Sequence, residues 1–132
     1  MKRNGFTFIE LLVVITIMAV VFAAGVVSYT TIAINSRDAR RRSDLEAIRQ
    51  ALEMCRSIAS EYPSSIYPAN PAAIICTDKS SSVTMKSTPV DPKPCDAQPD
   101  GHYTYSTTVD GGYTLTADCL EGATKTLTVT NP

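Results

Sequence analysis

An apolar run that extends from Phe6 to Ile34 contains one ionisable side chain, the carboxylate of Glu10. As a helix that rises 1.5 Å per residue, about 29 residues extend about 43 Å, which is enough to cross a hydrocarbon core of about 30 Å. A lone carboxylate near the centre of a membrane span costs about 2.5–3.5 kcal/mol on insertion scales. The sequence therefore predicts a membrane-spanning helix whose Glu10 side chain needs a partner.

A short polar segment precedes this run and joins it at a distinctive string. Lys2 and Arg3 lie in that segment, and the string reads Gly5-Phe6-Thr7-Phe8-Ile9-Glu10-Leu11-Leu12. It resembles the class III signal of type IV prepilins and type II secretion pseudopilins. The resemblance implies that a prepilin peptidase cuts between Gly5 and Phe6 and that the new terminal residue, Phe6, is N-methylated.

The resemblance also gives Glu10 a partner. It implies that Glu10 pairs with the terminal amine of an adjacent subunit and sets the axial register of a homo-oligomeric helical filament. Such a pair neutralises two charges in an apolar environment, where an unpaired carboxylate is costly. The other implied partners are the lipid bilayer before assembly, the prepilin peptidase and a membrane platform protein of the assembly machinery.

Two simpler interpretations of the apolar run compete with this one. An ordinary secretory signal would be cut near Val21-Phe22-Ala23 or Phe22-Ala23-Ala24, but Glu10 lies where the uninterrupted apolar region of such a signal should begin. A generic signal anchor explains the length of the run and gives no reason for the string from Gly5 to Glu10.

Basic residues lie on both sides of the span. Lys2 and Arg3 precede it, whereas Arg37 and the run Arg40–Arg42 follow it, so the positive-inside rule alone would place the C-terminal part in the cytoplasm. We expect instead one pass through the cytoplasmic membrane with residues 36–132 outside, because the cysteines and the family resemblance favour that side. The arginines would then meet lipid headgroups before assembly or acidic groups of neighbouring subunits afterwards, on a surface pilus or an extracytoplasmic filament.

The chain contains four cysteines, Cys55, Cys76, Cys95 and Cys119. An even number in an exported chain predicts two disulfides, for which three pairings exist. We favour Cys55–Cys76 with Cys95–Cys119, because each closes a loop within one segment, and loops of about 20–25 residues contribute about 3 kcal/mol each. A zinc site is the alternative, but no pair has the spacing that zinc sites usually show.

Three segments with different patterns follow the apolar run. Residues 36–61 predict an amphipathic helix that Pro63 stops. The apolar positions that recur at helical spacing are Leu45, Ile48, Leu52 and Cys55. Residues 62–101 are rich in proline and predict a loop, with a short helical turn near Pro71–Ile75.

Residues 102–130 change to a two-residue period, which predicts an antiparallel meander of three strands. Asp110-Gly111-Gly112 and Glu121-Gly122-Ala123 are the expected turns. The apolar face of the sheet would include Leu115, Leu127 and Val129. We expect this face to pack on the helical stripe, since neither element buries its apolar face alone.

The predicted fold is therefore α+β and pilin-like, with a long N-terminal helix packed on a small three-stranded antiparallel sheet. The expected organisation is a leader peptide at 1–5, a transmembrane or filament-core helix at 6–35 and an extracytoplasmic head domain at 36–132. Within the head domain the helix covers 36–61, the loop 62–101 and the meander 102–130.

No catalytic constellation is found in the sequence, so we expect neither an enzyme nor a cofactor. His102 has no serine or cysteine at a recognisable spacing, and we expect it in a turn or on the surface. Asp91, Asp96 and Asp100 are weak calcium candidates, because major pseudopilins bind calcium in a C-terminal loop, but they do not follow an EF-hand pattern. Contact of Arg40–Arg42 with nucleic acid lacks the support of interleaved aromatic residues, and we expect this run to be solvated or to contact other subunits.

The expected function is that of a structural subunit of a type IV pilus or pilus-like filament for adhesion, motility, DNA uptake or secretion. One alternative is a major-type pseudopilin of a type II secretion system. The segment from Arg37 through Leu45 to Tyr62-Pro63 resembles the branch of the family that contains major pseudopilins and simple pilins. A second alternative is a monomeric membrane-anchored extracytoplasmic binding domain, which would need no cleavage and would tolerate loss of Glu10.

Overall fold

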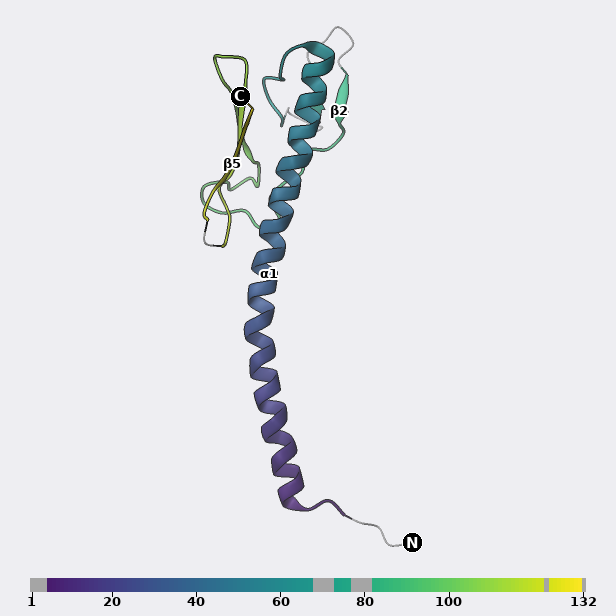
Figure 1. The fold of residues 1–132 in the computed structure, drawn as a ribbon, viewed down its shortest axis with the longest axis vertical. Helices are drawn as coiled ribbons and strands as arrows, with labels where there is room; N and C mark the ends of the chain where they lie inside the picture. The colour runs from purple at the N-terminus through teal and green to yellow at the C-terminus, as the bar shows by residue number, and fades with distance from the viewer. Residues whose placement is uncertain (1–4, 68–72, 77–81, 123, 132) are drawn as a thin grey trace. The chain divides into compact units, whose positions relative to one another are not determined.

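The computed structural model describes residues 5–67, 73–76, 82–122 and 124–131, with the side chains of Val27 and Ser28 left aside. The chain divides into two units, Met1–Ile34 and Asn35–Pro132. Helix α1, Phe8–Ala59, contributes residues to both units (Figure 1). It begins directly after Thr7 and ends where Ser60 adopts a left-handed backbone conformation with φ of 62°, as helices commonly end.

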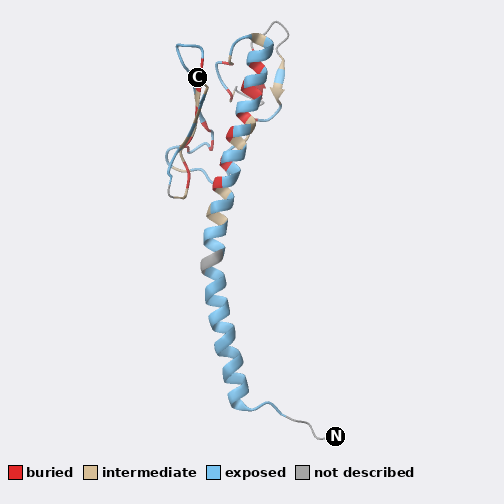
Figure 2. Ribbon diagram, in the orientation of Figure 1, coloured by how far each residue is buried: buried red, intermediate tan, exposed pale blue. Residues whose placement is uncertain are grey.

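In the first unit, α1 exposes its side chains on all sides (Figure 2). By length and composition, α1 is the one helix in the described part of the chain that could cross a membrane. The expected apolar helix is therefore present, and none of the side chains described in this unit is buried.

In the second unit, α1 packs on a three-stranded antiparallel sheet. The strands are β3 (Thr104–Thr107), β4 (Tyr113–Ala117) and β5 (Leu127–Asn131), in the order β3-β4-β5. Thr107 pairs with Tyr113 across the first hairpin, and Leu115 pairs with Val129 across the second. The predicted meander is confirmed, and the first turn contains Gly111 with a φ of 76°, a conformation that glycine adopts without steric cost.

A second, two-stranded sheet lies in the segment that the sequence predicted to be loop. Strand β1 (Ile74–Ile75) pairs antiparallel with β2 (Val83–Met85). The prediction of a helical turn near Pro71–Ile75 is wrong at Ile74 and Ile75, and Pro71 lies outside the described residues. Burial of Ile74 in the core and the adjacent Cys76 disulfide hold this short strand beside α1.

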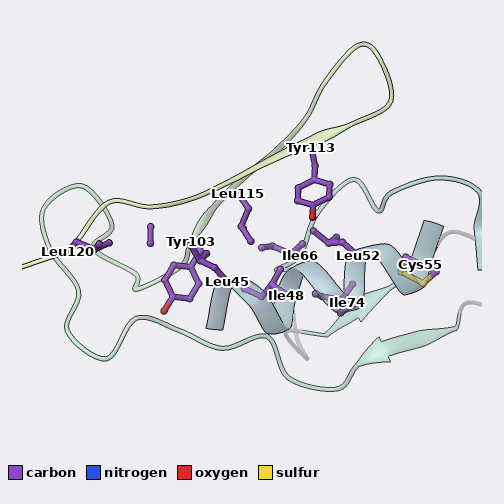
Figure 3. Packing of buried hydrophobic residues seen from close by; sticks show 13 residues of the cluster. Leu45, Ile48, Leu52, Cys55, Ile66, Ile74, Tyr103, Tyr113, Leu115 and Leu120 are labelled. Carbon is purple, nitrogen blue, oxygen red and sulfur yellow. A yellow bond between two sulfur atoms is a disulfide. The ribbon is translucent and has the colours of Figure 1, made fainter. Parts of the chain in front are cut away.

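The core of the second unit lies between one face of α1 and the two sheets. Figure 3 shows Leu45, Ile48 and Leu52 of the helix directed toward Leu115 and Tyr113 of β4. The predicted helical stripe is therefore buried against the predicted sheet. The other buried members of this cluster are Ala51, Cys55, Ile66, Ile74, Cys76, Tyr103, Ala117 and Leu120. Leu127 and Val129 are only partly buried and pack against its edge.

Candidate functional site

Thr7 and Glu10 form a reciprocal hydrogen-bonded cap at the first turn of α1. The Thr7 hydroxyl and backbone N–H both donate to Oε2 of Glu10, at 2.9 and 3.1 Å, and the Glu10 backbone N–H donates back to Thr7 Oγ1 at 3.3 Å. This is a capping box, in which a threonine and a glutamate three residues later satisfy N–H groups that the helix itself cannot pair. The chain therefore fixes the Glu10 carboxylate at the start of its own helix.

One oxygen of this carboxylate stays open. Both bonds from Thr7 end on Oε2, and Oε1 of Glu10 accepts no hydrogen bond within the described residues. The Glu10 side chain is exposed. Because an ionised carboxylate can accept hydrogen bonds at both oxygens, Oε1 can bind a cation while Thr7 keeps its bonds to Oε2.

Gly5 and Phe6 lie immediately before the cap and outside the helix. A Cβ atom added at Gly5 would meet nothing within 4 Å, and the Gly5 backbone is not in the left-handed region. Phe6 is 88% exposed. Neither residue is held by a tertiary contact in the described chain, so the expected cleavage bond is accessible. Residues 1–4 of the expected leader lie outside the described residues.

The exposed apolar surface of the first unit has a groove around Gly25. The groove has a volume of about 400 Å³, and Met18, Phe22, Val26 and Tyr29 are among its lining residues. A Cβ atom at Gly25 would meet nothing within 4 Å. The groove is thus a hollow in the outer surface of α1, where a second helix can approach closely.

Further along α1, one residue of the Arg40–Arg42 run, Arg41, is buried in an ion-pair network, whereas Arg40 and Arg42 are exposed. We call this network the Arg41 cluster. Its members are Arg37, Arg41 and Lys93 with Asp38, Asp91 and Glu121. Arg41 has no exposed side-chain surface and donates to Asp38, Asp91 and the carbonyl oxygen of Lys93. For Arg41, the expectation of a solvated or intersubunit side chain is therefore wrong.

Hydrogen bonds and charges in the Arg41 cluster lower the pKa values of two of its carboxylates, Glu121 and Asp38. The hydrogen bond from Arg37, followed by the one from Lys93, lowers the pKa of Glu121 to about 2. Burial alone would raise the pKa of Asp38, but hydrogen bonds from the Glu121 and Gly122 backbone N–H groups and from Arg41 lower it overall. Glu121 and Asp38 are therefore ionised at neutral pH, and the cluster joins α1 to two loops of the second unit.

The weak calcium candidates do not meet in the structure. Asp91 is engaged by Arg41, and both Asp96 and Asp100 are exposed. The described residues contain no group of three or more metal-ligating side chains. His102 is exposed, as expected, and its ring stacks on Tyr67 at a centroid distance of 4.0 Å.

Both disulfides of the favoured pairing are formed. Cys55–Cys76 joins α1 to the residue that follows β1. Cys95–Cys119 joins the loop before β3 to a residue two positions after the end of β4. The second bond lies close in sequence to Lys93 and Glu121, two members of the Arg41 cluster. Covalent and ionic links therefore hold the same two loops.

Comparison with known proteins identifies the beginning of the chain. The family model described as the prokaryotic N-terminal methylation motif matches residues 1–26. This motif is the class III signal peptide of type IV pilins and pseudopilins. No match was found among curated proteins or among solved structures. The matched segment contains Gly5, Phe6 and the Thr7–Glu10 cap, so the motif and the capped helix start coincide.

Proposed function

We propose that this chain, which carries the N-terminal methylation motif of pilins and pseudopilins, is a structural subunit of a type IV pilus or pilus-like filament. It is inserted in the membrane, cleaved after Gly5 and polymerised through its N-terminal helix. The filament would serve adhesion, motility, DNA uptake or secretion.

The observation that carries the proposal is the open oxygen of Glu10 at the start of an exposed apolar segment of α1. Cleavage after Gly5 creates a positive amine at Phe6, and the amine of an adjacent copy supplies the cation that Oε1 lacks within the described residues. In an apolar environment such a pair forms strongly, because each unpaired charge is costly there. The cap from Thr7 holds the carboxylate in place for this contact.

The surroundings of Gly5 support cleavage by an external enzyme. Nothing in the described fold needs glycine at this position, since a Cβ atom there would occupy open space. A peptidase that approaches the backbone closely does need a small residue. Glycine at position 5 therefore fits recognition by the peptidase, whereas the described fold does not require it.

Apolar packing would supply the energy of assembly. The described side chains of α1 are exposed from Phe8 to Ile32, and in water such an apolar surface would be unstable. Lipid covers it before assembly, and the same segments of neighbouring copies cover it in the filament core. The disulfide-linked head domains would then form the outer surface.

A pseudopilin of a type II secretion system is the second candidate, because the matched motif occurs in both groups. The two functions differ in what the cell displays. A pilin forms surface fibres that shearing releases, whereas a pseudopilin forms a short periplasmic filament. Electron microscopy of sheared material from the native host distinguishes them.

The first test of the proposal is the intact mass and N-terminal sequence of the protein from its native membrane. A chain that starts at a methylated Phe6 is expected. A chain that starts at Met1 in cells with an active prepilin peptidase, or one that starts at Ala23 or Ala24, would contradict the proposal.

The second test addresses Glu10. Glu10→Val should leave cleavage intact and strongly reduce the amount of filament, because the register contact is lost. Thr7→Val is the matched control: it removes the one hydroxyl hydrogen bond to Oε2 and costs about 1 kcal/mol of helix capping, but it keeps the carboxylate. Thr7→Val should therefore assemble better than Glu10→Val, and wild-type filament from Glu10→Val cells would exclude the register role.

A further inference from the structure

A cavity of about 310 Å³ lies where the second unit begins. Asn35, Asp38 and Arg42 of α1 line one side, and Leu120, Gly122 and Thr124 of the segment between β4 and β5 line the other. Asn35 directly follows Ile34, the last residue of the apolar unit. The cavity therefore lies at the point in the chain where the apolar segment gives way to the head domain.

The carboxylate inside this cavity is already satisfied. Oδ1 of Asp38 accepts hydrogen bonds from Arg41 and from the Glu121 N–H, at 2.7 and 3.1 Å, and Oδ2 accepts one from the Gly122 N–H at 2.9 Å. The three cations and three anions of the Arg41 cluster also balance one another. Asp38 thus contributes little unbalanced negative charge to the cavity.

Arg42 has no such partner. Within the described residues no ion pair or hydrogen bond engages its side chain, which is exposed. Two further exposed cations without an ion pair in the described chain, Arg40 and Lys125, lie next to the lining residues in sequence. Neither of these two lines the cavity, so Arg42 is the one charged lining residue without an ion pair in the described chain, and the wall also offers the Asn35 amide and the Thr124 hydroxyl as hydrogen-bonding groups.

The direction of Arg42 follows from helix geometry. Side chains on an α-helix lean toward its N-terminus and cover the preceding turn. Asn35, Asp38 and Arg42 are spaced by three and four residues, so they share one face of α1, and all three line the cavity. The guanidinium therefore lies over the helical turn that precedes Arg42, beside Asn35 and Asp38.

We propose that this cavity binds the phosphate group of a membrane phospholipid. The planar guanidinium of Arg42 donates to two phosphate oxygens, a geometry that suits arginine better than lysine, and Asn35 and Thr124 donate further hydrogen bonds. The lining begins at Asn35, one residue after the apolar unit ends in sequence, and long cationic side chains that follow a membrane span commonly reach the headgroups.

The inference requires a membrane anchor but not a filament. It would hold for a pilin, a pseudopilin or a monomeric anchored domain. If the cavity does not bind phosphate, the proposals of cleavage and assembly still hold. If the cleavage or assembly test fails, the phosphate site still holds.

The test uses the full chain in micelles of a nonionic detergent that contains no phosphate, observed by ¹H–¹⁵N NMR. Dimyristoylphosphatidylglycerol should shift the amide signals of Gly122 and Thr124 and the Nε–H signal of Arg42 in a saturable manner. Arg42→Gln should weaken binding about tenfold or more, which corresponds to loss of a charged hydrogen bond. Arg40→Gln is the matched control: it makes the same charge change at an exposed neighbour outside the cavity lining and should bind like wild type.

Several results would overturn the proposal. Binding by Arg42→Gln with wild-type affinity would remove Arg42 from the site, provided that signals outside the cavity show an intact fold. Equal shifts with dimyristoylglycerol, which lacks the phosphate, would exclude phosphate recognition. Equal affinity for inorganic phosphate would exclude the lipid as the source, and shifts that grow with protein concentration alone would identify an acidic group of a second copy as the partner.

Discussion

The guanidinium of Arg41 donates two parallel hydrogen bonds to the carboxylate of Asp91, at 2.7 and 2.8 Å, across 50 positions of the chain. Neither side chain has exposed surface. Arg41 also binds Asp38 on its own helix at 2.7 Å. The pair therefore fastens the loop before Cys95 to the beginning of the head-domain helix.

Asp91→Asn should lower the free energy of unfolding by about 3 kcal/mol, because it leaves a buried guanidinium short of a counter-charge. Urea unfolding of the full chain in detergent, followed by tyrosine fluorescence, measures this loss. Asp96→Asn is the matched control, since Asp96 is exposed in the same loop, and it should change stability by less than about 0.5 kcal/mol. Equal effects of the two changes would show that the Arg41–Asp91 pair contributes nothing specific.

Acid should weaken the Arg41 cluster through Glu121. Arg37 and Lys93 lower the pKa of Glu121 from its ordinary value of 4.5 to about 2 in the folded chain. A carboxylate with a lowered folded-state pKa stabilises the fold above its unfolded-state pKa, and this contribution is lost as the pH falls through the folded-state pKa. The midpoint of urea unfolding should therefore be steady above about pH 5 and fall between about pH 4.5 and 2.

Two variants assign this acid response to one residue. Glu121→Gln should be less stable than wild type at neutral pH and should lose less stability on acidification, because the group that titrates is gone. Glu61→Gln removes an exposed carboxylate that has no ion pair within the described residues and should keep the wild-type profile. An unchanged acid response in Glu121→Gln would place the titrating group elsewhere.

Local patterns were enough to predict most of the head domain. The helical spacing of Leu45, Ile48 and Leu52 predicted the buried face of α1, and the two-residue period after Gly101 predicted the three strands of the meander. Both signals depend on neighbours in sequence. The β1–β2 hairpin was missed because β1 has two residues and β2 three, too few to show a period.

The role of Arg41 was missed because its partner Asp91 is distant in sequence, and a run of three arginines usually marks a solvated surface. A signal was nevertheless present. Asp38 and Arg41 continue the helical stripe toward the N-terminus, since Asp38, Arg41 and Leu45 are separated by three and four residues. A charged pair at positions that belong to the buried face predicts a buried ion pair with a distant counter-charge.

Removal of the Cys55–Cys76 disulfide should lower the free energy of unfolding by about 3 kcal/mol, because the bond closes a loop between residues 21 positions apart. The double variant Cys55→Ala, Cys76→Ala tests this in the same urea experiment. Both cysteines are buried, so the same double variant, measured in reductant against reduced wild type, supplies the packing loss to be subtracted. A residual effect near zero would mean that packing of Ile74 alone holds β1 on the helix.

Gly25→Leu should reduce filament assembly and leave the head domain unchanged. Gly25 lies in an apolar groove of about 400 Å³ on the exposed surface of α1, and a larger side chain there meets nothing within the chain. Leucine would fill the hollow and prevent close approach of a neighbouring helix, since small residues permit such approach in apolar surroundings.

The measurement is the ratio of sheared filament to subunit retained in the membrane. Ile17→Leu, at an exposed position outside the groove lining, should assemble normally. If Gly25→Leu is cleaved after Gly5 and assembles normally, helices in the filament meet through another face of α1.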